Sequence, residues 1–116
     1  MIARIWRATA TDGENAEAYC RHFATEVAPH LKAIAGQRGA LLLKRQAGPQ
    51  VEFIALTLWD SIETVKQFTG PDVEVAIVAP RARAVLSTFD ASVTHYEIAG
   101  GFTPAQDVGL TVALSG

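Results

Sequence analysis

The sequence has few of the features that mark disulfide-bonded, nucleic-acid-binding or membrane proteins. Its 116 residues include one cysteine, Cys20, so no intrachain disulfide can form, and no CxxC zinc motif is present. Ten basic and twelve acidic residues give a net charge of −2, without the basic excess of nucleic-acid-binding domains. No apolar run approaches the roughly 20 residues that span a bilayer, and Met1–Arg7 is charged too early for a signal peptide. We therefore expect a soluble, cytoplasmic protein with no nucleic-acid or membrane partner.

The first third of the chain predicts a strand followed by a long helix. Most of residues 1–9 are β-branched, aromatic or small, and both alternating faces are largely apolar, as in a central strand. The T-x-x-E spacing of Thr11 and Glu14 is that of a capping box, so we expect a helix to begin there. Apolar residues then recur every three or four positions as far as Ile34, and Pro29 should kink this helix or start a new turn near His30.

The remainder predicts three more strands and a second set of helices. Residues 40–45 and 51–59 flank a Gly-Pro turn and indicate a hairpin. Asp60 or Ser61 can cap a helix that ends at Gly70-Pro71, residues 72–86 suggest short irregular helices, and residues 92–99 suggest a last strand. This order predicts an α+β, ferredoxin-like split βαβ domain over residues 1–99, with a four-stranded antiparallel sheet and helices on one face. Residues 100–116 form a C-terminal tail or an arm that reaches a partner.

The apolar character of two central strands predicts self-association. Helices on one side cover only one face of the sheet, yet the strands at 1–9 and 51–59 are apolar on both faces. A bare apolar sheet face exceeds the patch size that soluble monomers usually tolerate. We therefore expect a homodimer in which two sheets pack face to face.

Three strand segments resemble one known family. Met1-Ile2-Ala3-Arg4-Ile5-Trp6-Arg7, Leu56-Thr57-Leu58-Trp59-Asp60-Ser61 and Val93-Thr94-His95-Tyr96-Glu97-Ile98 are similar to strands of the antibiotic biosynthesis monooxygenases, and the resemblance covers residues 1–99. It implies a dimeric α+β barrel in which each subunit holds a small-molecule pocket between sheet and helices. Family members include cofactor-independent monooxygenases of electron-rich aromatic polyketides or quinols, haem-degrading proteins, and proteins with no assigned activity.

The haem-degrading branch can be compared by position. It uses an asparagine on the first strand, and a tryptophan and a histidine on the second helix. Counted from Trp59, the last two positions fall near Phe68 and Val78, and the first strand has no asparagine. The resemblance therefore does not extend to haem breakdown. Because glycine-rich phosphate loops and metal-ligand spacings are also missing, we expect neither a cofactor nor a metal.

Oxygenation without a cofactor requires a base, a group that stabilises an anion, and a dry pocket. His95, on the last strand, is the candidate base; a structural role is the alternative. Arg4, on the first strand, is the candidate for stabilising an enolate or oxyanion; an ion pair with Glu97 or another carboxylate is the alternative. In the ferredoxin-like fold the first and last strands lie side by side, so these two residues can reach a common space.

Four further residues are candidates for substrate binding. Trp6 and Trp59 can stack on a planar substrate or simply pack in the core. His30 lies beside the Pro29 break and can project into a pocket mouth or stay on the helix surface, and Tyr96 can donate a phenolic proton or pack. His22 and Glu26 are four residues apart and suggest a solvated pair. Two function classes remain: an oxygenase that uses the substrate's own reactivity, and a non-catalytic or stress-related binding protein.

Overall fold

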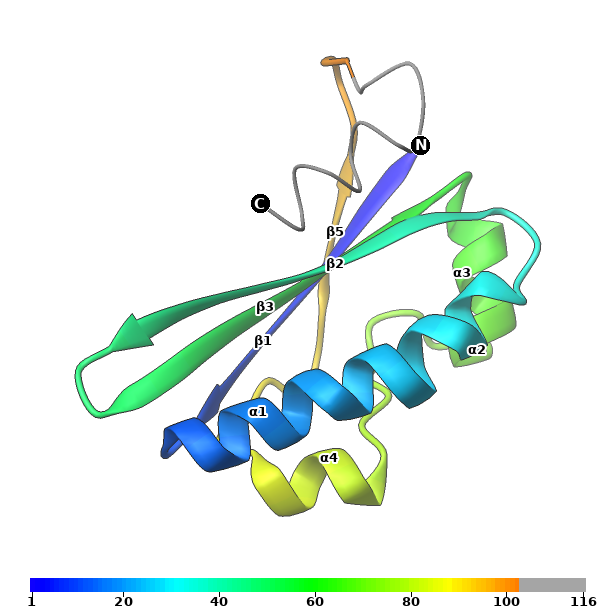
Figure 1. Ribbon diagram of the computed structural model, residues 1–116. Coiled ribbons are helices and arrows are strands. Elements are labelled where there is room, and N and C mark those ends of the chain that lie inside the picture. Colours follow the sequence, from blue (N-terminus) through cyan, green and yellow to red (C-terminus); the bar gives the residue numbers. More distant parts are fainter. Residues whose placement is uncertain (103–116) are drawn as a thin grey trace.

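The computed structural model describes residues 1–102. Its elements, in chain order, are β1 (Ile2–Ala10), α1 (Gly13–His22), the π-helical segment η1 (Phe23–Val27), α2 (Ala28–Lys32), β2 (Gln37–Ala47), β3 (Gln50–Trp59), α3 (Ile62–Thr69), α4 (Pro80–Val85), β4 (Thr88–Phe89) and β5 (Thr94–Glu97). Of the predicted tail or arm at 100–116, residues 103–116 lie outside the described residues. The helices lie on one side of the strands, with α4 beside α1 (Figure 1). The α+β, ferredoxin-like fold class is therefore confirmed.

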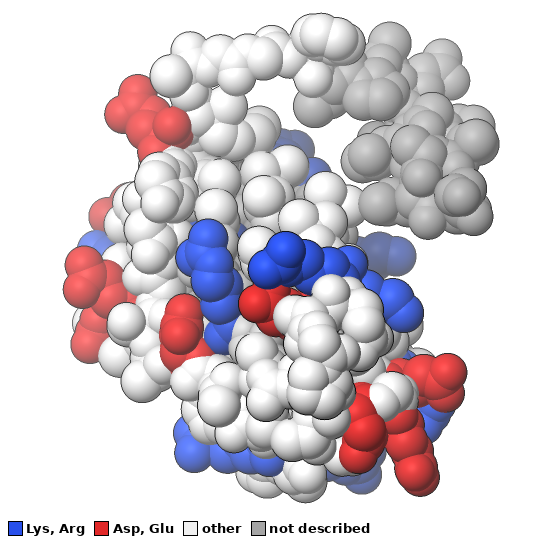
Figure 2. Space-filling model, turned by 90° about the vertical axis from the view of Figure 1, so that its left-hand side faces the viewer, with Lys and Arg blue, Asp and Glu red and all other residues white. Residues whose placement is uncertain are grey.

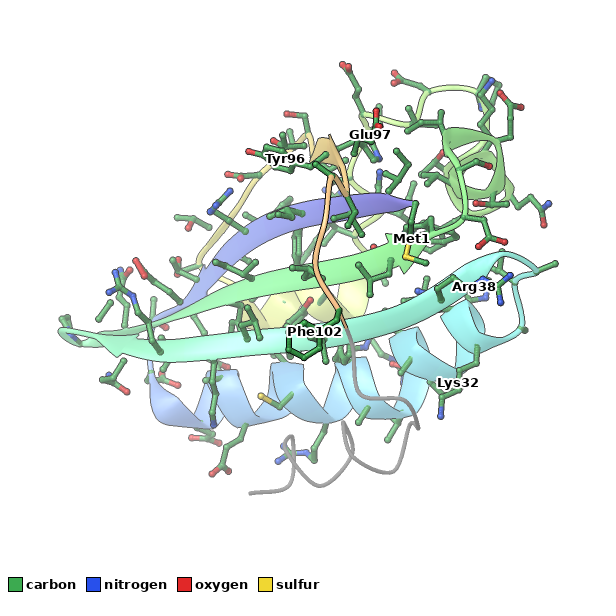
Figure 3. The ribbon with its side chains drawn as sticks, turned by 90° about the horizontal axis from the view of Figure 1, so that it is seen from above. Met1, Lys32, Arg38, Tyr96, Glu97 and Phe102 are labelled. Atoms are coloured by element: carbon green, nitrogen blue, oxygen red, sulfur yellow. The ribbon has the colours of Figure 1, made fainter. Side chains whose placement is uncertain are left out.

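β1 is the central strand of an antiparallel sheet. β3 pairs along one edge of β1 over its whole length, and β2 pairs with the far edge of β3. Figure 3 shows β1, β3 and β2 side by side in this order. β5 and the two-residue strand β4 pair with the other edge of β1, and Arg4 lies directly opposite His95. The sequence predicted four strands; β4 is an addition, and it is too short to show a periodic pattern.

The helix caps are partly those that the sequence predicted. Ser61 begins α3 with a capping box in which the Ser61 and Thr64 hydroxyls each accept from the other residue's backbone N–H. At α1 the prediction was wrong by one residue. Asp12, not Thr11, is the N-cap, and its carboxylate accepts from the backbone N–H of Asn15 at 2.8 Å. A carboxylate satisfies this position as well as a hydroxyl does, and its negative charge suits the positive end of the helix dipole.

The long helical stretch contains a wide π turn where the sequence predicted a kink. η1 separates α1 from α2, and Pro29 falls in the first turn of α2. Proline has no N–H to donate and its ring crowds the carbonyl four residues earlier, so a regular α-helix through Pro29 is disfavoured. The wide turn ends at Val27, shortly before Pro29. The helix is therefore interrupted earlier in the chain than the sequence predicted, which was near His30.

Two apolar clusters lie between the helices and the sheet. One is centred on Phe53, Tyr19 and the alanines of β1, and the other on Trp59, Leu31 and Val65. Trp59 is fully buried, and its indole N–H donates to the Thr57 hydroxyl at 2.8 Å. The two clusters are separated along β1 and β3 by Arg4 and Thr57, the two buried polar residues of the described chain. This polar break in the core marks the place of the candidate site.

The central part of the opposite face of the sheet is apolar and is not covered by a described helix, whereas Arg7 and Thr9 of β1, Arg45 of β2 and Glu52 of β3 lie at one end of it. Alternation along the strands places on it Ala3 and Ile5 of β1, Leu41 and Leu43 of β2, and Ile54, Leu56 and Leu58 of β3. Ile5, Leu56 and Leu41 form one row across three strands. This surface, the open face, is the one on which the predicted homodimer depends, and dimerisation stays a prediction.

The outer surface carries charges of both signs. On the face shown in Figure 2, Lys and Arg side chains are interspersed with Asp and Glu among a majority of other residues. Over residues 1–102, no helix combines the length and the apolar character needed to cross a membrane.

Candidate functional site

A cavity of about 670 Å³ lies between the helical layer and the sheet. Its floor is formed by Arg4 and Trp6 of β1 and by Ala55 and Thr57 of β3. One wall comes from α1, η1 and α2, and the other from the segment 76–82, which leads into α4. Phe68 of α3 closes one end. A volume of this size fits a small organic ligand of a few fused rings.

Arg4 is buried and carries no carboxylate partner among the described residues. Its guanidinium donates to the carbonyl oxygens of Val73 and Val75, at 2.5 and 3.1 Å, and its Nη1 lies 3.0 Å from His95 Nε2. The ring of Phe68 lies 5.8 Å from the guanidinium carbon. Burial lowers the pKa of Arg4 to about 10, so the group stays positively charged at neutral pH. The alternative of an ion pair with Glu97 is therefore wrong, because Glu97 lies opposite Ile2, is exposed, and forms no salt bridge with Arg4.

His95 contacts Arg4 and does not line the cavity. An arginine N–H can only donate, so His95 Nε2 accepts this bond and the ring proton resides on Nδ1. Burial and, secondly, the charge of Arg4 lower the pKa of His95 below its ordinary value, against an opposing effect of the Glu74 carboxylate. The sequence thus placed these two residues together correctly. The role of His95 as the base stays a prediction, and its one lone pair is already engaged.

The aromatic candidates separate into three environments. Trp6 lines the cavity, and its indole N–H donates to the carbonyl of Asp90 at 2.7 Å, which fixes the ring in the wall. Trp59 lies in the core and outside the cavity lining, which matches its packing alternative. Tyr96 follows His95, so it points to the open face; it is 54% exposed, next to the labelled Glu97 in Figure 3. Neither Trp59 nor Tyr96 is placed to touch a ligand of this cavity.

His30 lines the cavity from α2, with its ring 5.8 Å from that of Phe68, and is exposed at the protein surface. The sequence missed four other groups of the lining. Phe68 and Tyr19 add aromatic surface, and His22 and Glu26 add a hydrogen-bonded pair. Burial raises the pKa of Tyr19 to about 12, so its phenol stays protonated. Tyr19 lies three residues after Ala16, so the apolar periodicity of the helix could have indicated that it is buried. No local pattern indicates which residues of other elements face it across the cavity.

No group of three or more His, Cys, Asp or Glu residues within 1–102 is arranged to hold a metal ion. What the cavity offers instead is one buried positive charge, aromatic walls and three imidazole or carboxylate groups. Such a set can bind a planar ligand and stabilise negative charge on it.

Similarity to known proteins is visible in the fold. No family model matches the sequence, and no curated protein sequence matches it. A Bacillus cereus protein assigned to the antibiotic biosynthesis monooxygenases superimposes with a TM-score of 0.64 at 14% identity, covering 91% of this chain and 98% of that one. SnoaB of Streptomyces nogalater, described as a cofactor-independent oxygenase, gives 0.61 at 15% identity over 89% and 98% of the two chains.

A third neighbour shows the range of ligands found on this fold. MhuD, in a mutant with two manganese protoporphyrin IX molecules per active site, gives a TM-score of 0.59 at 17% identity over 90% of this chain and 100% of that one. Identities this low establish a shared fold and leave the chemistry to be argued from the site. The chain has the fold of the antibiotic biosynthesis monooxygenases, the family that its strand segments resemble.

Proposed function

We propose that this protein is a cofactor-independent, monooxygenase-like protein that acts on a small electron-rich aromatic, of the polyketide or quinol type, and works as a cytoplasmic homodimer. The observation that carries the proposal is Arg4, a buried guanidinium without a carboxylate partner within residues 1–102, at the floor of an aromatic-lined cavity. A buried charge is normally paired, so a ligand that supplies negative charge suits this position.

The chemistry follows from what such a substrate becomes when it loses a proton. An anthrone-type methylene flanked by aromatic rings gives a delocalised carbanion, whose negative charge Arg4 stabilises. That carbanion passes an electron to molecular oxygen, and the balanced outcome is CH₂ plus O₂ giving C=O plus H₂O. The protein's part is to bind the ring system between Trp6 and Phe68, accept the proton and hold the anion.

Two neighbours bear on this choice. SnoaB is described as a cofactor-independent oxygenase, which supports this reaction class for the fold. MhuD binds a metalloporphyrin, but Phe68 and Val78, at the positions of the haem-degrading residues in the resemblance, line this cavity and cannot ligate iron. Haem is accordingly kept as a control ligand rather than as the proposed substrate.

The second candidate function is non-catalytic binding of an aromatic metabolite. It is favoured by the geometry of His95, whose Nε2 lone pair is taken by Arg4. If no other group accepts a proton, the cavity binds without turnover.

Oxygen uptake and binding, measured on the same preparation, separate these candidates. The purified protein is mixed with anthrones and hydroquinones, and oxygen consumption is followed with an electrode while ligand binding is followed by quenching of the Trp6 and Trp59 fluorescence. Haem is titrated in parallel. Catalysed oxygen uptake with a carbonyl product supports the oxygenase; quenching without uptake supports the binding protein. Haem binding in preference to every aromatic tested, or no binding at all, contradicts both.

A further inference from the structure

We propose that His22, oriented by Glu26, is the proton acceptor of the cavity and therefore a catalytic residue. This inference rests on the proposed function, because it supplies the base that the oxygenase needs. The sequence suggested only a solvated pair for these residues. In the structure the His22 side chain is 9% exposed while that of Glu26 is 43% exposed, and both residues line the cavity.

The hydrogen bond between them fixes which nitrogen of His22 is basic. His22 Nδ1 lies 2.6 Å from Glu26 Oε2, and a carboxylate only accepts, so Nδ1 carries the proton. The lone pair of a neutral His22 is then on Nε2. The other carboxylate oxygen, Oε1, accepts from Arg81 Nη1 of α4 at 3.0 Å, so Glu26 is held from both sides of the cavity. This is the arrangement in which a carboxylate orients a histidine base.

His95 and His22 both have hydrogen-bonded side chains, but the two rings differ in whether the lone pair is free. His95 Nε2 uses its lone pair to accept a hydrogen bond from Arg4, and an arginine N–H cannot act as an acceptor. His22 gives its proton to Glu26 and keeps its lone pair. Of these two, His22 is the one that can take up a proton without first breaking the hydrogen bond that holds it.

The charges around the cavity balance such a proton transfer. The charged and titratable groups of its lining are Arg4 of β1, Arg81 of α4, Glu26 of η1, Tyr19 of α1 and His30 of α2. When a phenol binds, its O–H bond breaks with the electron pair left on oxygen, and a new N–H bond forms at Nε2 of His22. The imidazolium is then next to Glu26, the phenolate is attracted to Arg4, and the total charge is unchanged.

Nitrogen-15 NMR of the imidazole rings tests the transfer directly, because the protein has three histidines and about 12 kDa of mass. The probe is 4-cyanophenol near pH 7, where the free probe is mainly neutral and its ionised form absorbs at longer wavelength. The proposal requires that His22 in the free protein has its proton on Nδ1 and a free lone pair on Nε2. With the probe bound, we expect an ionised probe, an imidazolium at His22, and His95 unchanged.

Four results would overturn the proposal: His22 already protonated before the probe is added, a bound probe that stays neutral, an ionised probe with His22 still neutral, or no binding of the probe. The positioning role of Glu26 has its own signature. Glu26→Gln should let the His22 proton distribute between both ring nitrogens, whereas Glu17→Gln, an exposed position on α1, should leave the tautomer unchanged. If Glu26→Gln also keeps the proton on Nδ1, Glu26 does not orient His22.

Kinetics separate this inference from the proposed function. If an anthrone is turned over, His22→Gln should lower kcat by about 10²–10⁴, the usual contribution of a positioned base. Turnover of His22→Gln at the wild-type rate leaves the oxygenase standing and removes His22 from it. Conversely, protonation of His22 by the bound probe without oxygen uptake keeps the acceptor and removes the oxygenase.

Discussion

Replacing Arg4 with methionine tests whether the buried charge serves ligand binding or holds the fold together. Burial lowers the pKa of Arg4 from its ordinary value to about 10. Since one pKa unit corresponds to about 1.4 kcal/mol, burying the charge costs the folded state on the order of 3 kcal/mol at neutral pH. Methionine removes that cost and keeps most of the side-chain volume.

The substitution also removes stabilising contacts. Arg4 donates to the carbonyls of Val73 and Val75, and hydrogen bonds from a charged group contribute about 1.5 to 3 kcal/mol each. Part of this loss is recovered because water in the cavity can reach both carbonyls. The opposing effects are of similar size, so we expect Arg4→Met to change the free energy of unfolding by less than about 2 kcal/mol while abolishing the preference of the cavity for ionised phenols.

Urea denaturation and titration with 4-cyanophenol measure the two effects on the same samples. Arg21→Met, at an exposed position of α1, is the matched control and should change neither. A loss of more than about 4 kcal/mol in Arg4→Met, together with unchanged affinity for the ionised probe, would refute the reasoning. Arg4 would then be a structural cross-link between β1 and the segment that contains Val73 and Val75.

Three further predictions concern the open face, the core and pH. Sedimentation at micromolar concentration should show a dimer, and Leu56→Asp should make it monomeric; a stable wild-type monomer would contradict the homodimer. Thr57→Val should cost about 1–3 kcal/mol, because the Trp59 indole N–H loses its acceptor, whereas Thr57→Ser should restore most of it in thermal melts. The lowered pKa of His95 means that the unfolded chain binds its proton first, so stability should fall as pH drops below about 6.5; an equal fall in His95→Gln would argue against this origin.

The sequence predicted the sheet better than it predicted the cavity. Strand alternation and the side-by-side placement of the first and last strands were enough to bring Arg4 and His95 together, and the register places them directly opposite each other. The helix stripe also indicated which face of α1 is buried. These are properties of neighbouring residues or of one strand pairing, and periodicity reports them well.

The cavity depends on contacts that no local pattern contains. His22 and Glu26 are a solvated pair when only α1 and η1 are considered; Arg81, 55 positions later, makes them part of a wall. Trp59 and Trp6 have the same residue type and both lie on strands, yet one is fully buried in the core and the other faces the cavity. The packing of Phe68 and of the segment 76–82 decides which tryptophan faces the cavity. That packing is a tertiary contact, which the local sequence does not show.

The π turn at Phe23–Val27 also has a consequence for chain length. Each π-type bond closes a loop that is one residue longer than an α-helical turn, and here the backbone N–H of Ala28 donates to the carbonyl of Phe23. Inserting a residue into a regular α-helix rotates everything beyond it by about 100°, which would turn Leu31 out of the core. The wide turn absorbs that residue, so α1 and α2 both keep their buried faces toward the sheet. The π turn that makes this adjustment contains Glu26, which lies in the wall of the cavity.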